Sequence, residues 1–199
     1  MDEKKLEMLE RATSVYMKYG IKSVTMDDLA RELGISKKTI YKLFKDKNEL
    51  IAEMIQMKVE MEQAVCCNCT IQAENAIDDL LQITKLVTEN LGNINPTVFF
   101  DLKKYHPDAW AIIERHKWEF VLETITNNIK RGIEEGIYRK EINPTIIGRM
   151  YVVSIDMIMN PEIFPWPEFQ FEDLFKEIIR FQLNGMANEK GQKLLKKAL

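Results

Sequence analysis

The stretch from Thr25 to Leu50 constrains the fold of this chain more than any other segment. Thr25, with Asp28 three positions later, has the spacing of a capping box, which satisfies the unpaired N–H groups at a helix start. Val24 precedes this cap in the position of a hydrophobic staple. Gly34 suits the left-handed conformation that ends a helix. These signals predict a short helix that ends in a tight turn.

Two further helix starts follow that turn. Ser36 is placed to cap a second helix, and Ile35 and Ile40 occupy the positions of a second staple. Asp46, with Glu49 three residues later, is placed to open a third helix. Three start signals and one stop signal in so short a stretch predict a helix-turn-helix followed directly by another helix.

The middle helix has one strongly basic face. Lys38, Tyr41, Lys42 and Lys45 fall at i, i+3, i+4 and i+7, which places them on one exposed stripe. Between residues 35 and 47 there are five lysines and one acid, Asp46, so the segment carries a charge of +4 (5 − 1). A lysine-rich helix can be an ordinary solvated surface. Together with the turn and the caps, however, the charge favours a helix that enters the DNA major groove.

The first 50 residues resemble the N-terminal domain of the TetR family (tetracycline-repressor-like) of transcriptional regulators. The segment GIYRKEINP, residues 136–144, is similar to a later landmark of that family. The matching positions cover about a quarter of the chain, and they are Ala12, Tyr16, Gly20, Thr25, Met26, Ile35, Ser36, Thr39, Ile40, Tyr41, Phe44, Lys47, Leu50 and Ile51.

Eight residues are predicted to contact a double-stranded DNA operator. Those expected at phosphates are Thr25, Tyr41 and Lys47. Those expected in the groove are Lys37, Lys38, Thr39 and Lys42. Ser36 is expected to cap the helix and to lie close to a phosphate.

Composition and helical periodicity predict an all-α protein. The chain has only 8 glycines and 6 prolines in 199 residues. We expect a three-helix DNA-binding domain over residues 1–47 and a larger ligand-binding and dimerisation domain over 48–199. The net charge is −3, but residues 1–50 carry 11 basic and 9 acidic residues (+2), and the remainder carry 17 and 22 (−5). An acidic chain can therefore still bind DNA through its N-terminal part.

The C-terminal part is predicted to form a homodimer. Helices over about 144–159 and 168–187 are apolar on more than one face, and a single chain of this size offers few layers to cover them. We expect them to pack against their copies as a four-helix bundle, as the family resemblance also implies. The alternative is that both helices are buried inside a monomer. A lysine-rich, frayed tail is expected after residue 187.

An effector pocket is expected in the same part of the chain, lined by apolar and aromatic side chains. Asp156 stands out because it lies in an apolar run, and a buried carboxylate needs a partner, which could be an arginine of the other subunit, a hydroxyl group or a cationic ligand. Each aromatic candidate could instead belong to the ordinary core. The candidates are Phe99, Phe100, Tyr105, Trp110, Trp118, Phe120, Tyr151, Asp156 and Met157.

Signals for other kinds of chemistry are weak. The two histidines belong to no catalytic motif, so we expect no enzyme, no cofactor and no metal site. The fourth helix is expected to end near Val65, just before Cys66, Cys67 and Cys69. These three cysteines could sense a soft metal or an oxidant, or could simply be small apolar residues.

The location follows from what the chain lacks. Its charged N-terminus has no apolar core of a signal peptide, and no apolar run approaches the roughly 18 residues of a membrane span. An odd number of cysteines fits a reducing compartment, so we expect a cytoplasmic protein.

The sequence as a whole predicts a dimeric TetR-type repressor. The resemblance implies that it binds a palindromic operator and is released by a small apolar ligand. The alternative is a helix-turn-helix DNA-binding protein that is regulated by a protein partner and has no small-molecule effector. An α-helical enzyme would need a convergent polar cluster, which the sequence does not indicate.

Overall fold

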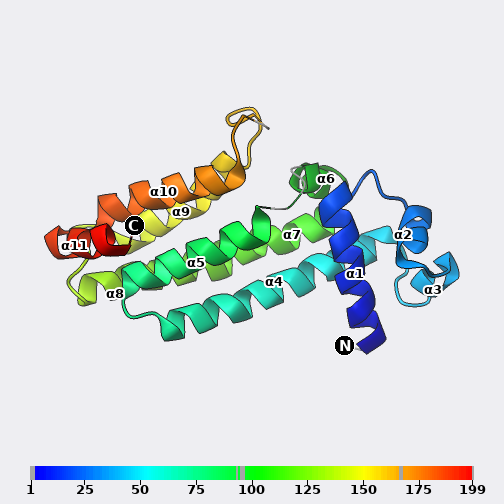
Figure 1. The fold of residues 1–199 in the computed structure, drawn as a ribbon, viewed down its shortest axis with the longest axis horizontal. Coiled ribbons are helices and arrows are strands. Elements are labelled where there is room, and N and C mark those ends of the chain that lie inside the picture. The colour runs from blue at the N-terminus through cyan, green and yellow to red at the C-terminus, as the bar shows by residue number, and fades with distance from the viewer. Residues whose placement is uncertain (1–2, 93, 95–96, 166–167, 199) are drawn as a thin grey trace. The chain divides into compact units, whose positions relative to one another are not determined.

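The computed structural model describes residues 3–92, 94, 97–165 and 168–198, and this part of the chain is built from helices (Figure 1). Its β-structure is limited to one isolated bridge between Tyr138 and Ala187. The all-α prediction is therefore confirmed. The helices are α1 Glu3–Tyr19, α2 Met26–Leu33, α3 Lys37–Tyr41, α4 Lys47–Gln72, α5 Ala76–Leu91, α6 Thr97–Tyr105, α7 Pro107–His116, the π-helical turn η1 Lys117–Val121, α8 Leu122–Glu134, α9 Pro144–Ile158, α10 Phe171–Met186 and α11 Glu189–Ala198.

The chain folds into two compact units. Unit 1 comprises Met1–Glu62 and Asn93–Arg115, and unit 2 comprises Gln63–Gly92 and His116–Leu199. This geometric division differs from the boundary expected between residues 47 and 48. The reason is that the first turns of α4 carry Leu50, Ile51 and Met54, which are completely buried in the core of unit 1.

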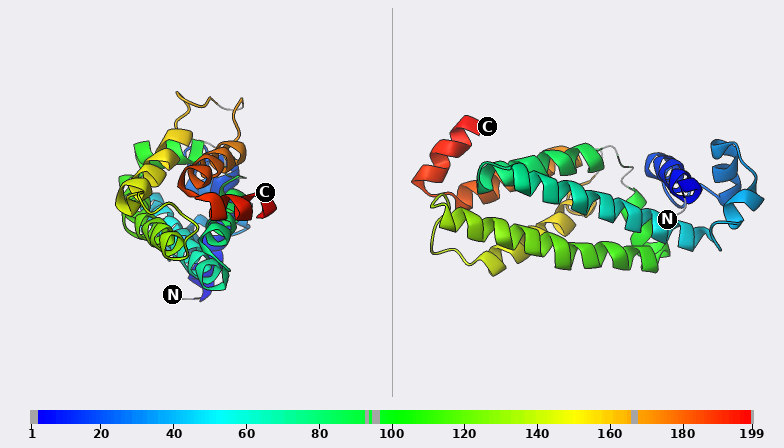
Figure 2. Two further views of the ribbon diagram at one scale, coloured as in Figure 1. Left: turned by 90° about the vertical axis from the view of Figure 1, so that its left-hand side faces the viewer. Right: turned by 90° about the horizontal axis from the view of Figure 1, so that it is seen from below.

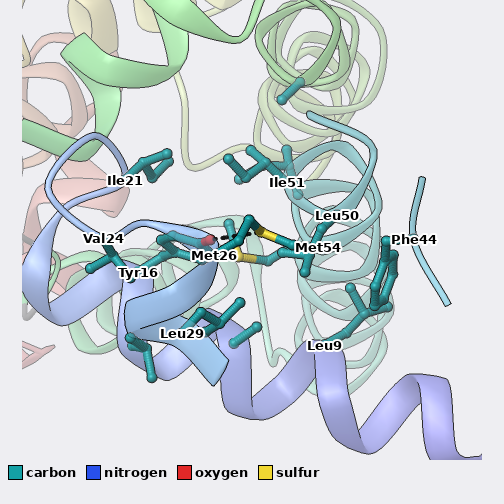
Figure 3. Packing of buried hydrophobic residues seen from close by; sticks show 14 of the residues in the cluster. Leu9, Tyr16, Ile21, Val24, Met26, Leu29, Phe44, Leu50, Ile51 and Met54 are labelled. Carbon is teal, nitrogen blue, oxygen red and sulfur yellow. Dashed lines mark hydrogen bonds between the residues drawn. The ribbon is translucent and has the colours of Figure 1, made fainter. Parts of the chain in front are cut away.

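The core of unit 1 joins the helix-turn-helix to α1 and to the start of α4 (Figure 3). The ring of Tyr16 is fully buried there, and its hydroxyl lies 3.9 Å from the sulfur of Met26. Burial raises the pKa of Tyr16, so the phenol stays neutral. Val98 and Leu102 of α6 belong to the same core, so α6 packs in the unit that holds the helix-turn-helix.

Unit 2 is a helical bundle in which α5 packs on α8 and α10, and α9 packs on the same two helices (Figures 1 and 2). A buried polar network lies among α4, α5 and α8. The Asn128 side-chain amide donates to Asp79 Oδ2 at 2.7 Å and to the carbonyl of Ala76 at 2.8 Å. Tyr138 donates to the same carbonyl at 3.3 Å. These bonds satisfy polar groups that would otherwise be costly to bury.

The helix α4 is longer than expected, because it continues through the cysteines to Gln72 and does not end near Val65. Its end is held by Arg131, which donates to the carbonyls of Thr70 at 3.4 Å and Ala73 at 2.9 Å. Arginine can satisfy the last carbonyls of a helix in this way. This partner is more than 55 residues away in sequence, so local helix-stop signals could not reveal it.

The C-terminal tail was expected to fray, and this prediction was wrong. Residues Glu189–Ala198 form α11, with Leu195 only 2% exposed. Asn188 opens the helix by accepting hydrogen bonds from the N–H groups of Lys190 and Gly191. The lysines occupy the solvated side, so the tail is an amphipathic helix that packs on α5.

The helical stretch from Pro107 to Glu134 contains one irregularity. Its α-helical pattern changes to a π-helical turn at Lys117–Val121. Such a turn inserts extra backbone into the helix and often marks a functional position. Here it accompanies the burial of the Lys117 side chain, which is 7% exposed.

Candidate DNA-binding site

The N-terminus of α2 has the capping geometry that the sequence predicts. The backbone N–H of Asp28 donates to Thr25 Oγ1 at 3.2 Å, and the N–H of Thr25 donates to Asp28 Oδ2 at 3.1 Å. The Thr25 hydroxyl and N–H, together with Arg31, hold the pKa of the Asp28 carboxyl below its usual value. Gly34 ends the helix at φ 69°, in the left-handed region that favours glycine. The turn into α3 is therefore rigidly defined at both ends.

The helix α3 is short and is held from one side. Ser36 Oγ accepts a hydrogen bond from the N–H of Thr39 at 3.1 Å. Ile40 is fully buried and fastens the helix to the core of unit 1. Asp46 then opens α4 by accepting the N–H of Glu49 at 2.9 Å. The caps and the buried isoleucine together leave the opposite side of α3 open to solvent.

Seven of the eight predicted DNA-contacting residues are exposed around α2 and α3. The Lys37 ammonium donates to Asp27 Oδ2 at 2.8 Å, which raises the pKa of Lys37. Tyr41 is 45% exposed although it is aromatic. The exposed residues are Thr25, Ser36, Lys37, Lys38, Thr39, Tyr41 and Lys42. They form an open surface with cationic, hydroxyl and aromatic groups, which is suited to phosphates and base edges.

Lys47 is arranged differently from these seven. Its ammonium donates to the main-chain carbonyls of Ile21 and Val24, each at 2.6 Å, and lies 5.3 Å from the ring centroid of Tyr16. Desolvation by burial lowers the pKa of Lys47. Lys47 therefore holds the connection between α1 and α2 against the start of α4.

Sequence reasoning missed a set of contacts between α6 and the connection from α1 to α2. The N–H of Lys22 donates to Asp101 Oδ2 at 2.8 Å, and Asp101 is only 5% exposed. Gly20, at φ 86°, allows this approach, because a Cβ there would lie 2.9 Å from Thr97 Oγ1. These residues are about 80 positions apart, and no local pattern predicts their pairing.

A second contact links α4 to the end of α6. His106 Nδ1 lies 2.7 Å from Asn48 Oδ1, and the histidine is 8% exposed. Burial, and next the positive charge of Lys47, lower the pKa of His106. The neutral imidazole therefore predominates near neutral pH.

The effector candidates are divided between the two units. Phe99, Phe100, Tyr105 and Trp110 belong to unit 1, where Phe100 is 56% exposed and Tyr105 accepts a hydrogen bond from Lys22 Nζ at 3.1 Å. Trp118, Phe120, Tyr151, Asp156 and Met157 belong to unit 2.

The candidates in unit 2 have different surroundings. Tyr151 is buried, with its ring at an edge-on angle to Phe175. Phe120 stacks on His116 with ring centroids 5.3 Å apart. Trp118 faces the guanidinium of Arg149 at 5.7 Å. The separate contacts do not by themselves define one pocket.

Asp156 was expected to be a buried carboxylate, but within the single chain it is not buried. Its side chain is 48% exposed, and its partner is Lys117 of the same chain, with Nζ 2.5 Å from Asp156 Oδ1. The buried member of the pair is the lysine, whose side chain is 7% exposed. The apolar run around Asp156 indicated burial, but the position falls on the side of α9 that reaches solvent.

Comparisons with known proteins agree with this geometry. The model of bacterial regulatory proteins of the tetR family matches residues 8–54. The uncharacterized HTH-type transcriptional regulator YhgD of Bacillus subtilis (strain 168) is 39% identical over 187 residues, which cover 90% of this chain and 91% of that protein. The uncharacterized HTH-type regulator YvaF of the same organism is 28% identical, over 82% of this chain and 86% of that protein.

A solved structure extends the likeness to the whole fold. A putative transcriptional regulator from Saccharomonospora viridis, in complex with choline, has a TM-score of 0.78 and 16% identity, and the match covers 95% of this chain and 100% of that one. The fold and the exposed, capped helix-turn-helix define a DNA-binding transcriptional regulator. The chain belongs to the tetR family.

Proteins of this family are transcriptional regulators, which in general are not enzymes. Within the described residues, no helix combines the length and the apolar character needed to cross a membrane.

Proposed function

We propose that this chain is a repressor that binds a palindromic operator as a homodimer and is released from it by a small ligand. The observation that carries the proposal is the exposed basic surface of α3. The buried side chain of Ile40 packs the opposite side of this helix into the core, and Ser36 caps its N-terminus. A short helix supported in this way can place its N-terminal residues at base edges in the major groove.

Individual contacts follow from the exposure of the side chains. Lys37, Lys38, Thr39 and Lys42 are proposed to enter the groove, because all four are exposed on α3 or directly after it. Thr25 is proposed to contact a phosphate, since it lies at the N-terminus of α2, where N–H groups and the helix dipole favour anions.

Three other predicted contacts need separate roles. Tyr41 is proposed to contact a phosphate through its exposed hydroxyl. Ser36 is proposed to act mainly as a cap, close to a phosphate. For Lys47 we propose a supporting role in the same site, because its ammonium already binds two main-chain carbonyls.

The proposed dimer interface lies on α9 and α10. These helices expose apolar side chains that a solvated surface would not favour, including Ile146 (57%), Met150 (59%), Val153 (53%) and Phe181 (78%). Each helix also packs on the other within the chain (Figure 1). Two copies of this pair would cover the exposed face as a four-helix bundle and would present two reading helices to a twofold-symmetric site.

The proposed effector is a small organic molecule bound within the C-terminal part of the chain. Support comes from the Saccharomonospora viridis regulator of similar fold, which was solved in complex with choline. A ligand that weakens operator binding a hundredfold must supply about 2.7 kcal/mol of coupling free energy between the two sites.

The test of DNA reading is binding of the purified protein to the DNA upstream of its own gene at two or more salt concentrations. The variant Lys38→Ala/Tyr41→Ala is compared with a matched control, Lys18→Ala/Tyr19→Ala, which removes an exposed lysine and tyrosine from α1. We expect the first variant to lose sequence-specific binding and the control to keep it. Because the variant removes one lysine per subunit from the DNA contact, the salt slope should fall by at most about 2 for a dimer.

Specific binding that both variants retain would show that α3 is not the reading helix. If a genome-wide DNA selection yields no specific site, the DNA-reading proposal is wrong.

The dimer is tested by light scattering on Phe181→Glu, which places a charge on the proposed interface. We expect wild type at twice the chain mass of 23.3 kDa and the variant at the chain mass. Glu177→Gln, an exposed change on the same helix, is the control. A variant that stays dimeric would place the interface elsewhere.

A further inference from the structure

We propose that Cys66 and Cys69 form a reversible dithiol–disulfide site on α4, through which a peroxide weakens DNA binding. The effect on DNA rests on the proposed function, whereas the disulfide can be tested without it. None of the three cysteines on α4 is in a disulfide in the structure.

The placement of the thiols selects one pair. Residues of an α-helix are about 100° apart, so Cys66 and Cys69 lie about 60° apart on one side, whereas Cys67 is about 160° from Cys69. Cys66 is 5% exposed, Cys69 is half-buried and Cys67 is exposed. Cys69 can therefore meet a small oxidant, and Cys66 is its neighbour one turn earlier.

The helical spacing makes the disulfide possible but strained. The Cα atoms of residues three apart in a helix are about 5 Å apart, within the range that a disulfide spans. Their Cβ atoms are about 5–6 Å apart, whereas a disulfide brings them to about 3.5–4.5 Å. The bond can therefore close only if α4 deforms locally by about 1–2 Å. Strained disulfides are also reduced readily, as a regulatory site requires.

The end of α4 is anchored directly after Cys69. Thr70 Oγ1 donates to Asp79 Oδ1 at 2.9 Å, and Asp79 is only 1% exposed. Arg131 holds the carbonyl of Ala73 at 2.9 Å. Because these bonds oppose unwinding of the last turn, the deformation must be absorbed on the N-terminal side of Cys66.

That side of α4 leads to the DNA-binding unit. The helix is continuous from Lys47 to Gln72, and its first turns carry Leu50, Ile51 and Met54 in the core of unit 1. A change in the course of α4 therefore acts on an element that supports α3.

The chemistry balances with hydrogen peroxide as the oxidant. The Cys69 thiolate attacks one peroxide oxygen, the O–O bond breaks, and the leaving hydroxide takes up the thiol proton as water. The resulting sulfenic acid is attacked by the sulfur of Cys66, the S–O bond breaks, and a second water leaves with the Cys66 proton. Two thiols and one peroxide thus give one disulfide and two waters. A small-molecule dithiol restores both thiols by exchange.

The test treats the reduced full-length protein with hydrogen peroxide and maps its thiols by alkylation and mass spectrometry. We expect a loss of two hydrogens from the peptide that contains Cys66 and Cys69, reversed by dithiothreitol. Cys69→Ser should abolish the loss, and the matched control Cys67→Ser should retain it. Operator affinity should fall at least tenfold on oxidation of the wild type and of Cys67→Ser, but not of Cys69→Ser.

Each outcome decides one point. If peroxide forms no bond between Cys66 and Cys69, the proposal is overturned, whatever the DNA result. A disulfide that forms without a change in operator affinity overturns the coupling to DNA. If the reduced protein binds no specific DNA, the proposed function fails. The thiol mapping, together with the helical circular dichroism signal, then still tests whether the disulfide between Cys66 and Cys69 forms.

Discussion

The ion pair between Lys117 and Asp156 joins a buried lysine to a half-exposed aspartate. It allows a quantitative test of whether removal of each partner costs a different amount of folding stability. Asp156→Ala leaves the 7%-exposed lysine without this carboxylate, which is otherwise 2.5 Å from its ammonium. Breaking a fully buried pair costs about 3–5 kcal/mol, and breaking an exposed pair costs about 0–1 kcal/mol. Because the aspartate is 48% exposed, we expect an intermediate loss of about 2 kcal/mol.

Removal of the lysine should cost less folding stability than removal of the aspartate. Lys117→Met replaces a buried ammonium by an apolar side chain of similar size, and the remaining carboxylate can be hydrated. We expect a change within about 1 kcal/mol, because buried pairs replaced by apolar residues are often neutral or better. The double variant should then resemble Lys117→Met, with a coupling energy of about 1–2 kcal/mol.

The assay is urea unfolding of the wild type and of the three variants at one protein concentration, since a dimer's stability depends on concentration. In a thermal scan, a loss of 2 kcal/mol should lower Tm by roughly 4–8 °C in a chain of this size. The coupling should persist at 1 M salt, because buried charges are weakly screened. If both single variants lose equal stability and the coupling is zero, the reasoning from unequal burial is wrong.

Three further predictions concern other parts of the fold. Because the pKa of His106 is lowered in the folded protein, only the unfolded chain binds a proton at this residue just below pH 6.5. The free energy of unfolding should therefore fall on acidification, by at most about 1.4 kcal/mol per pH unit. Urea unfolding of His106→Gln should show a weaker pH dependence. Gly132→Ala would place a Cβ 2.1 Å from the Tyr138 ring and should cost about 1–3 kcal/mol of folding stability. Gly185→Ala would place a Cβ with nothing within 4 Å and should stabilise α10 by about 0.5–1 kcal/mol. Equal effects of the two substitutions would contradict this reasoning. Leu195→Ala should cost about 2–4 kcal/mol by calorimetry if α11 is packed, and nothing if the tail frays.

Local signals in the sequence were sufficient for the helix-turn-helix. Thr25, Ser36, Gly34 and Asp46 act on backbone groups within three or four residues, and the structure shows the expected hydrogen bonds and the left-handed turn. The exposure of the α3 lysines also followed from periodicity, since Ile40 could point to only one side of a helix.

Longer-range pairings decided the points at which sequence reasoning failed. The end of α4 depends on Arg131, the order of the tail depends on contacts with α5, and the partner of Asp156 is a lysine 39 positions earlier. Periodicity marks a position as apolar or polar, but it does not identify the residue that will lie opposite.

The sequence by itself determined the class of fold, the caps and turn of the helix-turn-helix, and the positive charge of its exposed surface. Each of these depends on neighbours within one or two helical turns. Only the tertiary structure decided that Lys47 faces main-chain carbonyls, that Asp101 holds the N–H of Lys22, and that Lys117 is the buried member of its pair. These outcomes depend on which surfaces meet when separate helices pack, and burial then sets the energy of each charge.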